Sequence, residues 1–495
     1  MGRTIKIIIF YLFASAVSLN AASNTIEIKT DYDLKGQTMR LSEGSVLHFL
    51  GGRIVNGILV GNATIIDAQP VEIFAENVTL EGSWNVKVAY PEWFGAKACD
   101  DKDALKYSEK NRLAIQRCVD VFTHTIFSNA NPSKKYFVSP EKGKEYVINV
   151  SKRGRIIEGL DVDRTVLITP KNVKSTKILY FSEPSAGSRA SDCLVQNLKI
   201  MHQDGGTFAN TGIYISFKCS GIRLIGIHLE QLDTCVYDES WTQILKRVKC
   251  YGSNGFVFKS PKGLRTTVSM EDCSVSDAKV GYKFDNLLYS NLVCCGADRC
   301  ELAFELKDCS VIGFQSCGTE DCRAVLNMDS CKEITINLDA ILTKGKADEY
   351  GFSKADMRNY FRVTGNSNQI VFSNCLFSIH KSSSLKKISD DELAFFTVIR
   401  TNGSSPLVTF RNCSGGFNET GTPFYNLVCV DDKGGKYYDR QSVILENCAF
   451  TSGSTSRRPK LNNILRGYQY FDTSLGKPVW YKGDGVWVDA TGKSL

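Results

Sequence analysis

A step of about 22 residues between cysteines constrains the fold more than any other feature of the chain. The pairs that keep this step are Cys250–Cys273, Cys273–Cys295, Cys295–Cys317, Cys300–Cys322 and Cys309–Cys331. Repeats of 20 to 50 residues are typical of solenoids. Short apolar segments recur at a similar spacing without a helical pattern, at residues 213–215, 236–237, 256–258, 282–284, 304–306 and 325–326. Short strands at this period, separated by Gly, Asn, Asp and Ser, predict an all-β solenoid, a parallel β-helix with coils of about 22 residues.

Composition permits a large core and excludes few partners. The chain has 495 residues, 43% of them hydrophobic, and a formal net charge of +7. Lysines and arginines are interleaved with acidic residues rather than gathered in a basic arm, so we expect no nucleic-acid partner. The mild positive charge suits an acidic polysaccharide, but solubility alone explains it equally well.

The amino terminus has the pattern of a secretory signal. Arg3 and Lys6 precede an apolar run over residues 7–17, and small residues follow it. This pattern predicts a signal peptide over residues 1–22 and an exported protein that is secreted, periplasmic or at the cell surface. The run is too short to span a bilayer, and no later segment is long and apolar enough, so we expect no transmembrane segment.

Eighteen cysteines in an exported chain suggest disulfides, but their spacing favours another arrangement. Cysteines at equivalent places in successive coils point the same way, about 4.8 Å apart. Stacked free thiols pack well in a core, whereas side chains in parallel register strain the dihedral angle of a disulfide. Stacked thiols are therefore the favoured interpretation, with disulfides between neighbours as the alternative.

Changes in composition and in the pattern of apolar residues divide the chain into three parts after the predicted signal peptide. Residues 23–90 alternate apolar and polar positions with frequent glycines, which indicates an amino-terminal β-rich cap. Residues 91–455 form the coils, with one helix expected at about 110–122 and charged loops at about 343–361 and 380–393. Residues 456–495 form a short carboxyl-terminal β module. Its Trp480 and Trp487 are interpreted as packing against the last coil, or as platforms for sugars.

One region resembles a known family. Residues 94–97 (Phe-Gly-Ala-Lys), 114–116 (Ala-Ile-Gln), 140–146 and 157–159 keep the order of motifs found in the pectate-lyase-like β-helix superfamily. The usual Asp-Gly pair after the first motif is missing, and Asp100, Asp101 and Asp103 are the nearest equivalents. The resemblance covers about residues 90–450. It implies a right-handed parallel β-helix and an exported protein that acts on polysaccharides.

The resemblance does not extend to a polygalacturonase-like active site. Residues 210–213 are similar to the Asn-Thr-Asp motif of those hydrolases but lack its aspartate. Residues 233–236 keep one of two expected carboxylates, and residues 252–255 lack the expected histidine. Inverting hydrolysis needs one carboxylic acid and one carboxylate base across the scissile bond, so this reaction is disfavoured.

The outward face of the strand stack offers candidates for binding or β-elimination. Strand alternation predicts that Tyr214, Tyr237, Val257, Lys283 and Glu305 point outward. A lyase needs a base beside the sugar carboxylate and a group that neutralises that carboxylate. We take as catalytic candidates Lys283, Asp233, Glu305 and His202, and as substrate-binding candidates Tyr214, Tyr237, Glu301 and Arg299. An ordinary solvated strand face is the competing interpretation for each residue singly.

Two functions remain open at this point. The first is an exported polysaccharide lyase or glycoside hydrolase with its groove along the outward strand stack. The second is a glycan-binding protein without catalysis, similar to an adhesin or a tail spike. The predicted partner in both is a polysaccharide. We expect no cofactor and no metal site; calcium would suit a lyase, but no dense aspartate cluster indicates it. The oligomeric state is not constrained.

Overall fold

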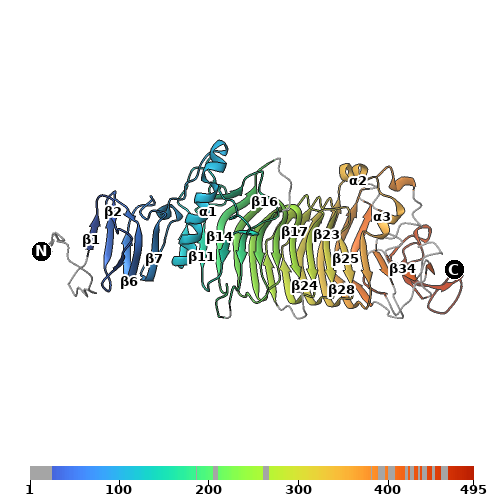
Figure 1. Ribbon diagram of the computed structural model, residues 1–495. Helices are drawn as coiled ribbons and strands as arrows, with labels where there is room; N and C mark the ends of the chain where they lie inside the picture. Colours follow the sequence, from blue (N-terminus) through green and yellow to red (C-terminus); the bar gives the residue numbers. More distant parts are fainter. Residues whose placement is uncertain are drawn as a thin grey trace.

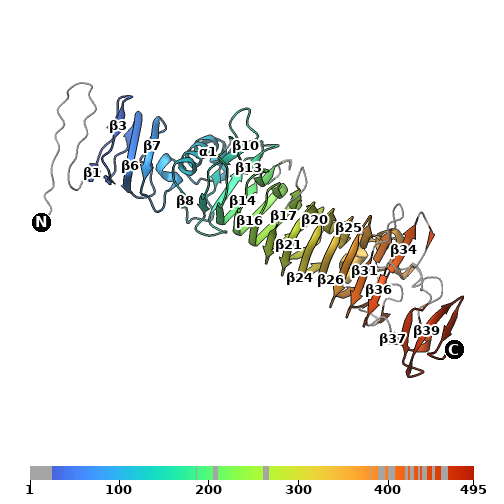
Figure 2. The ribbon, with the colours of Figure 1, turned by 90° about the horizontal axis from the view of Figure 1, so that it is seen from below.

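The computed structural model is an elongated stack of parallel strands with a separate sheet at each end (Figures 1 and 2). It describes residues 25–185, 187–204, 210–259, 267–380, 382–387, 396–399, 407–417, 422–423, 428–432, 435–436, 443–448, 452–458 and 467–495. The predicted signal peptide lies outside the described residues. No helix in these ranges combines the length and the apolar character that crossing a membrane requires.

The elements are as follows. The amino-terminal strands are β1 (Thr25–Ile28), β2 (Tyr32–Asp33), β3 (Thr38–Arg40), β4 (Val46–Phe49), β5 (Ile54–Val55), β6 (Gly57–Asp67) and β7 (Val78–Trp84). The 3-10 turns η1 (Pro91–Phe94) and η2 (Asp101–Asp103) precede helix α1 (Ala104–Val121). The stack begins with β8 (His124–Ile126), β9 (Tyr136–Phe137), β10 (Tyr146–Val150), β11 (Ile156–Glu158), β12 (Val166–Thr169), β13 (Lys177–Phe181), β14 (Leu194–His202), β15 (Thr211–Ile215), β16 (Arg223–Asp238) and β17 (Gln243–Lys259).

The middle of the stack contains β18 (Val268–Glu271), β19 (Ser274–Ser276), β20 (Val280–Asp285), β21 (Leu288–Val293), β22 (Gly296–Asp298), β23 (Leu302–Lys307), β24 (Ser310–Glu320), β25 (Leu326–Asp329) and β26 (Lys332–Leu342). Helices α2 (Lys344–Tyr350) and α3 (Lys354–Arg358) follow. Then come β27 (Phe361–Thr364), β28 (Asn368–Ser373), β29 (Leu376–Ile379), η3 (Leu385–Lys387), β30 (Phe396–Ile399), β31 (Val408–Arg411), β32 (Ser414–Phe417), β33 (Thr422–Pro423), β34 (Val428–Asp432), β35 (Gly435–Lys436) and β36 (Val443–Glu446). The terminal sheet contains β37 (Ser452–Gly453), β38 (Gln469–Asp472), β39 (Lys477–Gly483) and β40 (Val486–Val488), with η5 (Thr455–Arg457) beside it.

Most strands of the stack pair in parallel along three ladders, and only β33 and β35 among the described strands of the stack pair antiparallel, with β32 and β34. The parallel ladders confirm the prediction of a mostly β chain with parallel pairing. The first ladder joins β10, β13, β15, β16, β17, β20, β23, β25 and β27. The second joins β18, β21, β24, β26, β28 and β31. The third joins β19, β22, β24, β26 and β29. We call one passage of the chain through the three ladders a rung.

Bends between the ladders recur at equivalent residues of successive rungs. Asp277, Arg299 and Asp321 each adopt a positive φ, at 57°, 51° and 53°. Aspartate tolerates this left-handed conformation because its short side chain bonds locally, whereas arginine does so only where neighbouring contacts compensate. The guanidinium of Arg299 binds the Asp277 carboxylate across a separation of 22 residues, with Nε–Oδ1 and Nη2–Oδ2 distances of 2.8 and 3.0 Å. The bend is therefore held by bonds between rungs.

One hydrophobic core runs from Ile28 to Cys448. Aromatic rings stack along its axis: the centroid of Tyr282 lies 5.0 Å from that of Phe256 and 4.9 Å from that of Phe304. The Tyr282 hydroxyl donates to the carbonyls of Cys273 and Gly296, at 2.9 and 3.0 Å. This phenol therefore fills the core and also satisfies two buried bends.

The seventeen cysteines whose side chains the structure describes are free thiols, and all of these except Cys294 are buried. In the repeating columns the thiol lies near backbone carbonyls; the Cys322 Sγ, for example, is 3.5 Å from the Ala297 oxygen. A hydrogen bond with Cys300, together with burial, raises the pKa of Cys322 well above its ordinary value. These thiols therefore pack as small neutral core groups.

We expect a thiol reagent applied to the native protein without reductant to label about one described cysteine, Cys294, because the others are buried. In denaturant, still without reductant, all eighteen cysteines of the chain should react. The measurement is a colorimetric thiol count, with a reduced denatured sample as the control. A shortfall of two or more thiols in the non-reduced denatured sample would show a disulfide and contradict the stacked-thiol arrangement.

The amino-terminal strands form their own parallel sheets, in which β6 pairs with β3, β4 and β7. Helix α1 lies between these sheets and the stack (Figure 1), and it begins several residues earlier than the sequence predicts. Its buried Ala114, Ile115 and Cys118 belong to the common core. The Arg117 guanidinium lies 4.6 Å from the Phe94 ring centroid and donates to the Ala75 carbonyl at 3.1 Å. The helix thus contributes to the common core and ties the two parts together.

The carboxyl-terminal sheet has a small core of its own, in which Trp487 contacts Tyr470 and Tyr481. The expectation that Trp487 packs against the last coil is therefore wrong. A buried ion pair, Arg458 Nε to Asp472 Oδ2 at 2.6 Å, joins the segment after β37 to this sheet. The charged segment at 343–361 also differs from the expected loop, because it contains α2 and α3.

Candidate functional site

Four of the predicted residues lie in one outward row of the first ladder. The strand register places Tyr180, Tyr214 and Tyr237 side by side on successive rungs. It then continues through Val257 and Lys283 to Glu305. We call this set of six residues the outward row. Strand alternation turns every second side chain of a strand away from the core, so one row of the ladder faces solvent.

The tyrosine half of the outward row is continuous. Ring centroids are 5.7 Å apart between Tyr180 and Tyr214, and 4.9 Å apart between Tyr214 and Tyr237. Tyr146 extends the series, 5.4 Å from Tyr180. The Lys177 Nζ lies 4.6 Å from the Tyr214 centroid and 5.2 Å from that of Tyr180. Tyr214 and Tyr237 are stacked, with their planes inclined by 14°, whereas Tyr180 meets Tyr214 edge to face at 67°. Together the rings and their phenol groups form a surface that is apolar and hydrogen-bonding at once.

The phenol groups of Tyr180 and Tyr214 are neutral. Burial, and secondarily the neighbouring Glu239, raises the pKa of Tyr214, and burial raises the pKa of Tyr180. A phenol with a raised pKa is a poor proton acceptor at neutral pH. These tyrosines are therefore suited to holding a ligand rather than to removing a proton from it.

The charged half of the row consists of one ion pair. The Lys283 Nζ lies 2.8 Å from the Glu305 Oε2, and the two side chains are 41% and 28% exposed. Val257 lies between this pair and Tyr237 and is only 7% exposed. Because its side chain is much shorter than those of its neighbours, the surface of the row is lower at Val257, between the Tyr237 ring and the Lys283–Glu305 ion pair. We call this depression the step at Val257. Lys283 follows Tyr237 by two rungs, about 10 Å at the usual strand spacing.

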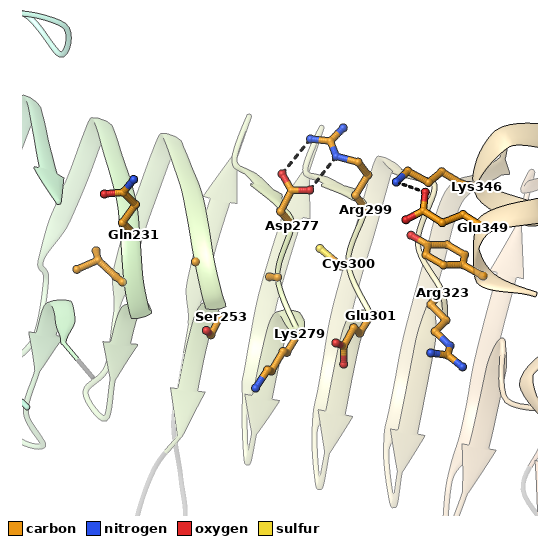
Figure 3. A pocket seen from close by; sticks show the side chains of 14 residues that line it. Gln231, Ser253, Asp277, Lys279, Arg299, Cys300, Glu301, Arg323, Lys346 and Glu349 are labelled. Atoms are coloured by element: carbon orange, nitrogen blue, oxygen red, sulfur yellow. Dashed lines mark hydrogen bonds and ion pairs between the residues drawn. The ribbon is translucent and has the colours of Figure 1, made fainter. Parts of the chain in front are cut away.

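A hollow of about 550 Å³ lies beside this face. It is lined by the bends at residues 231–232, 252–253, 277–279 and 299–301, by Arg323, and by Lys346, Glu349 and Tyr350 of α2. These bends immediately precede the first-ladder strands, so the hollow opens at the edge where β20 and β23 begin. Figure 3 shows the bends in succession with α2 beyond them. Its volume is in the range of small-molecule binding sites.

Arg299 is the central cation of one wall of the hollow. Besides its two bonds to Asp277 it contacts Asp298. Burial, and secondarily the nearby Glu320 and two other acids, raises the pKa of Asp298, whereas Arg299 lowers it. The guanidinium thus offsets a group of carboxylates that the stacking of rungs brings together.

The eight predicted site residues therefore lie in three places: the outward row, the hollow with the bend beside it, and the interior. Tyr214, Tyr237, Lys283 and Glu305 lie in the outward row, and Arg299 and Glu301 line the hollow. Asp233 follows the lining residues 231–232, and its Oδ2 lies 3.2 Å from the Thr234 hydroxyl.

His202 is in the interior, and the expectation that it faces the strand stack is wrong. Its exposure is 0%, and it pairs with Thr169 across the strands. The Nδ1 atom lies 2.9 Å from Thr169 Oγ1 and 3.1 Å from Asn210 Nδ2. Burial lowers the pKa of His202, so the ring is neutral and Nδ1 accepts these bonds. The alternation of β14 turns this side chain inward.

Sequence reasoning missed Tyr180 of the outward row, Tyr146 and Lys177 beside it, and Lys279, Arg323 and α2 of the hollow. The early rungs are longer than those in the middle of the chain. Asn210, for example, accepts a hydrogen bond from the Thr176 amide of the rung before it, although the two residues are 34 positions apart in the sequence. Without a regular step, the tyrosines could not be aligned by counting. For Lys279 and Arg323 a signal existed, because they lie about one step from Glu301.

The described residues contain no group of three or more His, Cys, Asp or Glu side chains arranged to hold a metal ion.

Comparisons with known proteins give architectural similarity alone. No protein-family model and no curated protein match the sequence. Tailspike protein 3 of bacteriophage CBA120 is 12% identical, with a TM-score of 0.40, over 82% of this chain and 70% of that chain. The gp42 tailspike of Acinetobacter phage vb_AbaP_AS12 is 12% identical, with a TM-score of 0.47, over 81% and 74%. DFA-IIIase from Arthrobacter chlorophenolicus A6 is 8% identical, with a TM-score of 0.45, over 68% and 86%. Function is therefore argued from the residues.

Proposed function

We propose that the protein is an exported right-handed parallel β-helix, with coils of about 22 residues in its middle, that binds an extended polysaccharide along the outward row. We retain the division into residues 1–22, 23–90, 91–455 and 456–495. The observation that carries the proposal is the row of tyrosines, in register on successive rungs, that ends in the Lys283–Glu305 ion pair.

The spacing of the row suits a sugar chain. Successive rungs are about 4.8 Å apart, and a saccharide unit spans about one rung. Apolar ring edges pack against the C–H faces of a sugar, and the phenols and the ion pair exchange hydrogen bonds with its hydroxyls. The step at Val257 gives one sugar a place between Tyr237 and Lys283.

Hydrolysis is poorly supported by the carboxylates of this region. Glu305 is bonded to Lys283, and Asp277 is bonded to Arg299. Asp233 and Glu301 are three rungs apart, because Asp233 lies beside Ser253, and the Ser253 and Ala278 carbonyls accept from the Lys279 and Glu301 amides. Their backbones are thus about 14 Å apart. Glycosidases place their two carboxylates about 5 to 9.5 Å apart.

A second candidate function is β-elimination, favoured by the position of Lys283 beside the step. In this reaction Lys283, as the free amine released from its pair with Glu305, would take the proton from the carbon next to a uronate carboxylate. The glycosidic carbon–oxygen bond would break as a carbon–carbon double bond forms, and the ammonium so formed would give the proton to the leaving oxygen.

The purified protein is tested against a panel of acidic and neutral polysaccharides by affinity electrophoresis and by the ultraviolet absorbance of unsaturated products. We expect retention on at least one polysaccharide. If absorbance also rises, Lys283→Ala should abolish that rise, because the base is lost, with Lys332→Ala as an exposed control on another ladder. Lack of retention by every polysaccharide would contradict the proposed function, and unchanged turnover in Lys283→Ala would remove the lysine from the mechanism.

A further inference from the structure

Some of the charged residues that line the hollow form ion pairs with one another, and others do not. Asp277 binds Arg299, and Lys346 lies 2.6 Å from Glu349. These two pairs lie along one side of the hollow (Figure 3). Their charges offset each other, so they contribute shape rather than net charge.

The helical wall is fixed to the stack. The Asp321 carboxylate accepts from the Thr343 amide at 2.7 Å and from its hydroxyl at 3.1 Å, just before α2 begins. At the end of the helix the Tyr350 hydroxyl donates to the Asp321 carbonyl at 2.6 Å. Ala347, between these contacts, is fully buried. The hollow is thus formed before any ligand arrives, which lowers the entropic cost of binding.

The other side of the hollow has charges that the walls leave uncompensated. Lys279 and Glu301 are exposed and lie one rung apart, since Val280 pairs with Leu302. Neither side chain forms an ion pair or a hydrogen bond with another described residue. Arg323 comes next, and its Nη2 reaches Asp356 at 3.4 Å, outside the lining. Within the lining one acid therefore lies between two cations. A bound carboxylate would pair with Lys279 and compete with Asp356 for the Arg323 guanidinium.

The hollow and the outward row lie at different positions along the same strands: the hollow at the bends before them, and the row on the strands themselves. Lys279 precedes Lys283 by four residues, about 13 Å along an extended strand. A linear chain that follows the row across the rungs passes the hollow at this distance. A ligand that fills both must therefore send a branch of about two or three sugars along the strand direction.

Resting on the proposed function, we propose that the hollow binds an acidic side branch of a branched polysaccharide whose main chain lies on the outward row. Lys279 and Arg323 donate to the carboxylate of the branch, the guanidinium offering a planar pair of donors that matches it. Glu301, between them, accepts from sugar hydroxyls. The substrate class is thus a branched polysaccharide with the carboxylate in the branch.

The full-length protein is tested on an array of microbial polysaccharides of known repeating unit, printed beside the carboxyl-reduced form of each acidic one. We expect the strongest signals from polymers with acidic branches and at least a tenfold weaker signal after carboxyl reduction. Lys279→Ala combined with Arg323→Ala should cause a similar loss and abolish the difference between parent and reduced forms. Lys332→Ala is the matched control, and Glu301→Gln should weaken parent and reduced forms alike.

The outcomes separate the two proposals. Binding that is equally strong for linear or neutral polymers, or unchanged in the double variant, overturns the acidic-branch assignment while the proposed function stands. Absence of binding to every polymer overturns both. If the double variant loses binding and also unfolds at a lower temperature, Lys279→Gln combined with Arg323→Gln separates the two causes. The glutamines keep much of the aliphatic part of each side chain and remove the charge. Retained affinity in that folded variant overturns the assignment.

Discussion

Replacing Tyr214 and Tyr237 together by alanine is expected to weaken polysaccharide binding about a hundredfold or more. These rings form the closest ring contact of the row, with centroids 4.9 Å apart and planes inclined by 14°. Tyrosines at the centre of a binding surface often contribute about 2 kcal/mol each, and every 1.4 kcal/mol is a tenfold change in affinity. The measurement is a dissociation constant by biolayer interferometry for the polysaccharide that is retained in affinity electrophoresis.

The control for this double variant is Tyr289→Ala. Tyr289 is 61% exposed, but it belongs to β21 on the second ladder rather than to the row. Its replacement should leave affinity unchanged. The thermal unfolding temperature of the double variant is measured in parallel, because the row faces outward and the core should be preserved. A folded double variant that binds like the original protein would exclude the row as the binding surface.

The second large effect is expected on stability, from Tyr282→Ala. Tyr282 is fully buried between Phe256 and Phe304, and its hydroxyl donates to two carbonyls. Removing a buried aromatic side chain typically costs about 3 to 5 kcal/mol, and the two carbonyls lose their donor besides. In a stack of rungs the loss is local, because each rung contacts only its neighbours. We therefore expect faster hydrogen exchange in β17, β20 and β23, measured by mass spectrometry.

Tyr282→Phe separates packing from hydrogen bonding. It keeps the ring and removes the hydroxyl, so it should cost about 1 to 3 kcal/mol, the price of leaving buried carbonyls without a donor. Tyr282→Ala should lower the free energy of unfolding clearly more than Tyr282→Phe does, as measured by unfolding in denaturant. Equal effects of the two substitutions would show that ring packing at this position contributes little.

The regular part of the fold was predictable because its step is short and constant. Where Val280 pairs with Leu302, and Leu288 with Ser310, counting by 22 is enough to align the strands and to turn Lys283 and Glu305 outward. The amino-terminal rungs contain longer bends, and counting fails there. Tyr180 was missed for this reason, although it continues the row from Tyr214.

The misplacement of His202 has a different cause. The sequence shows it beside a polar segment, which favours exposure, but the alternation of β14 and its pairing with Thr169 turn it inward. A histidine is accepted in the interior when it stays neutral and its ring nitrogen accepts bonds, here from Thr169 and Asn210. Asn210 is eight residues from His202, but Thr169 lies 33 residues earlier on another strand, and its pairing with His202 could not be anticipated.

The sequence by itself determined the parallel pairing of strands in the middle of the chain, the inward cysteines and the outward direction of Tyr214, Tyr237 and Lys283. It could do so because a strand alternates every two residues and the rungs repeat at a fixed step, both of which are local properties. Only the tertiary structure decided that Lys283 is paired with Glu305, that Arg299 is held by Asp277, and that α2 closes one side of a hollow. Ion pairs and walls depend on side-chain conformations and on an inserted segment of irregular length, and neither follows the repeat.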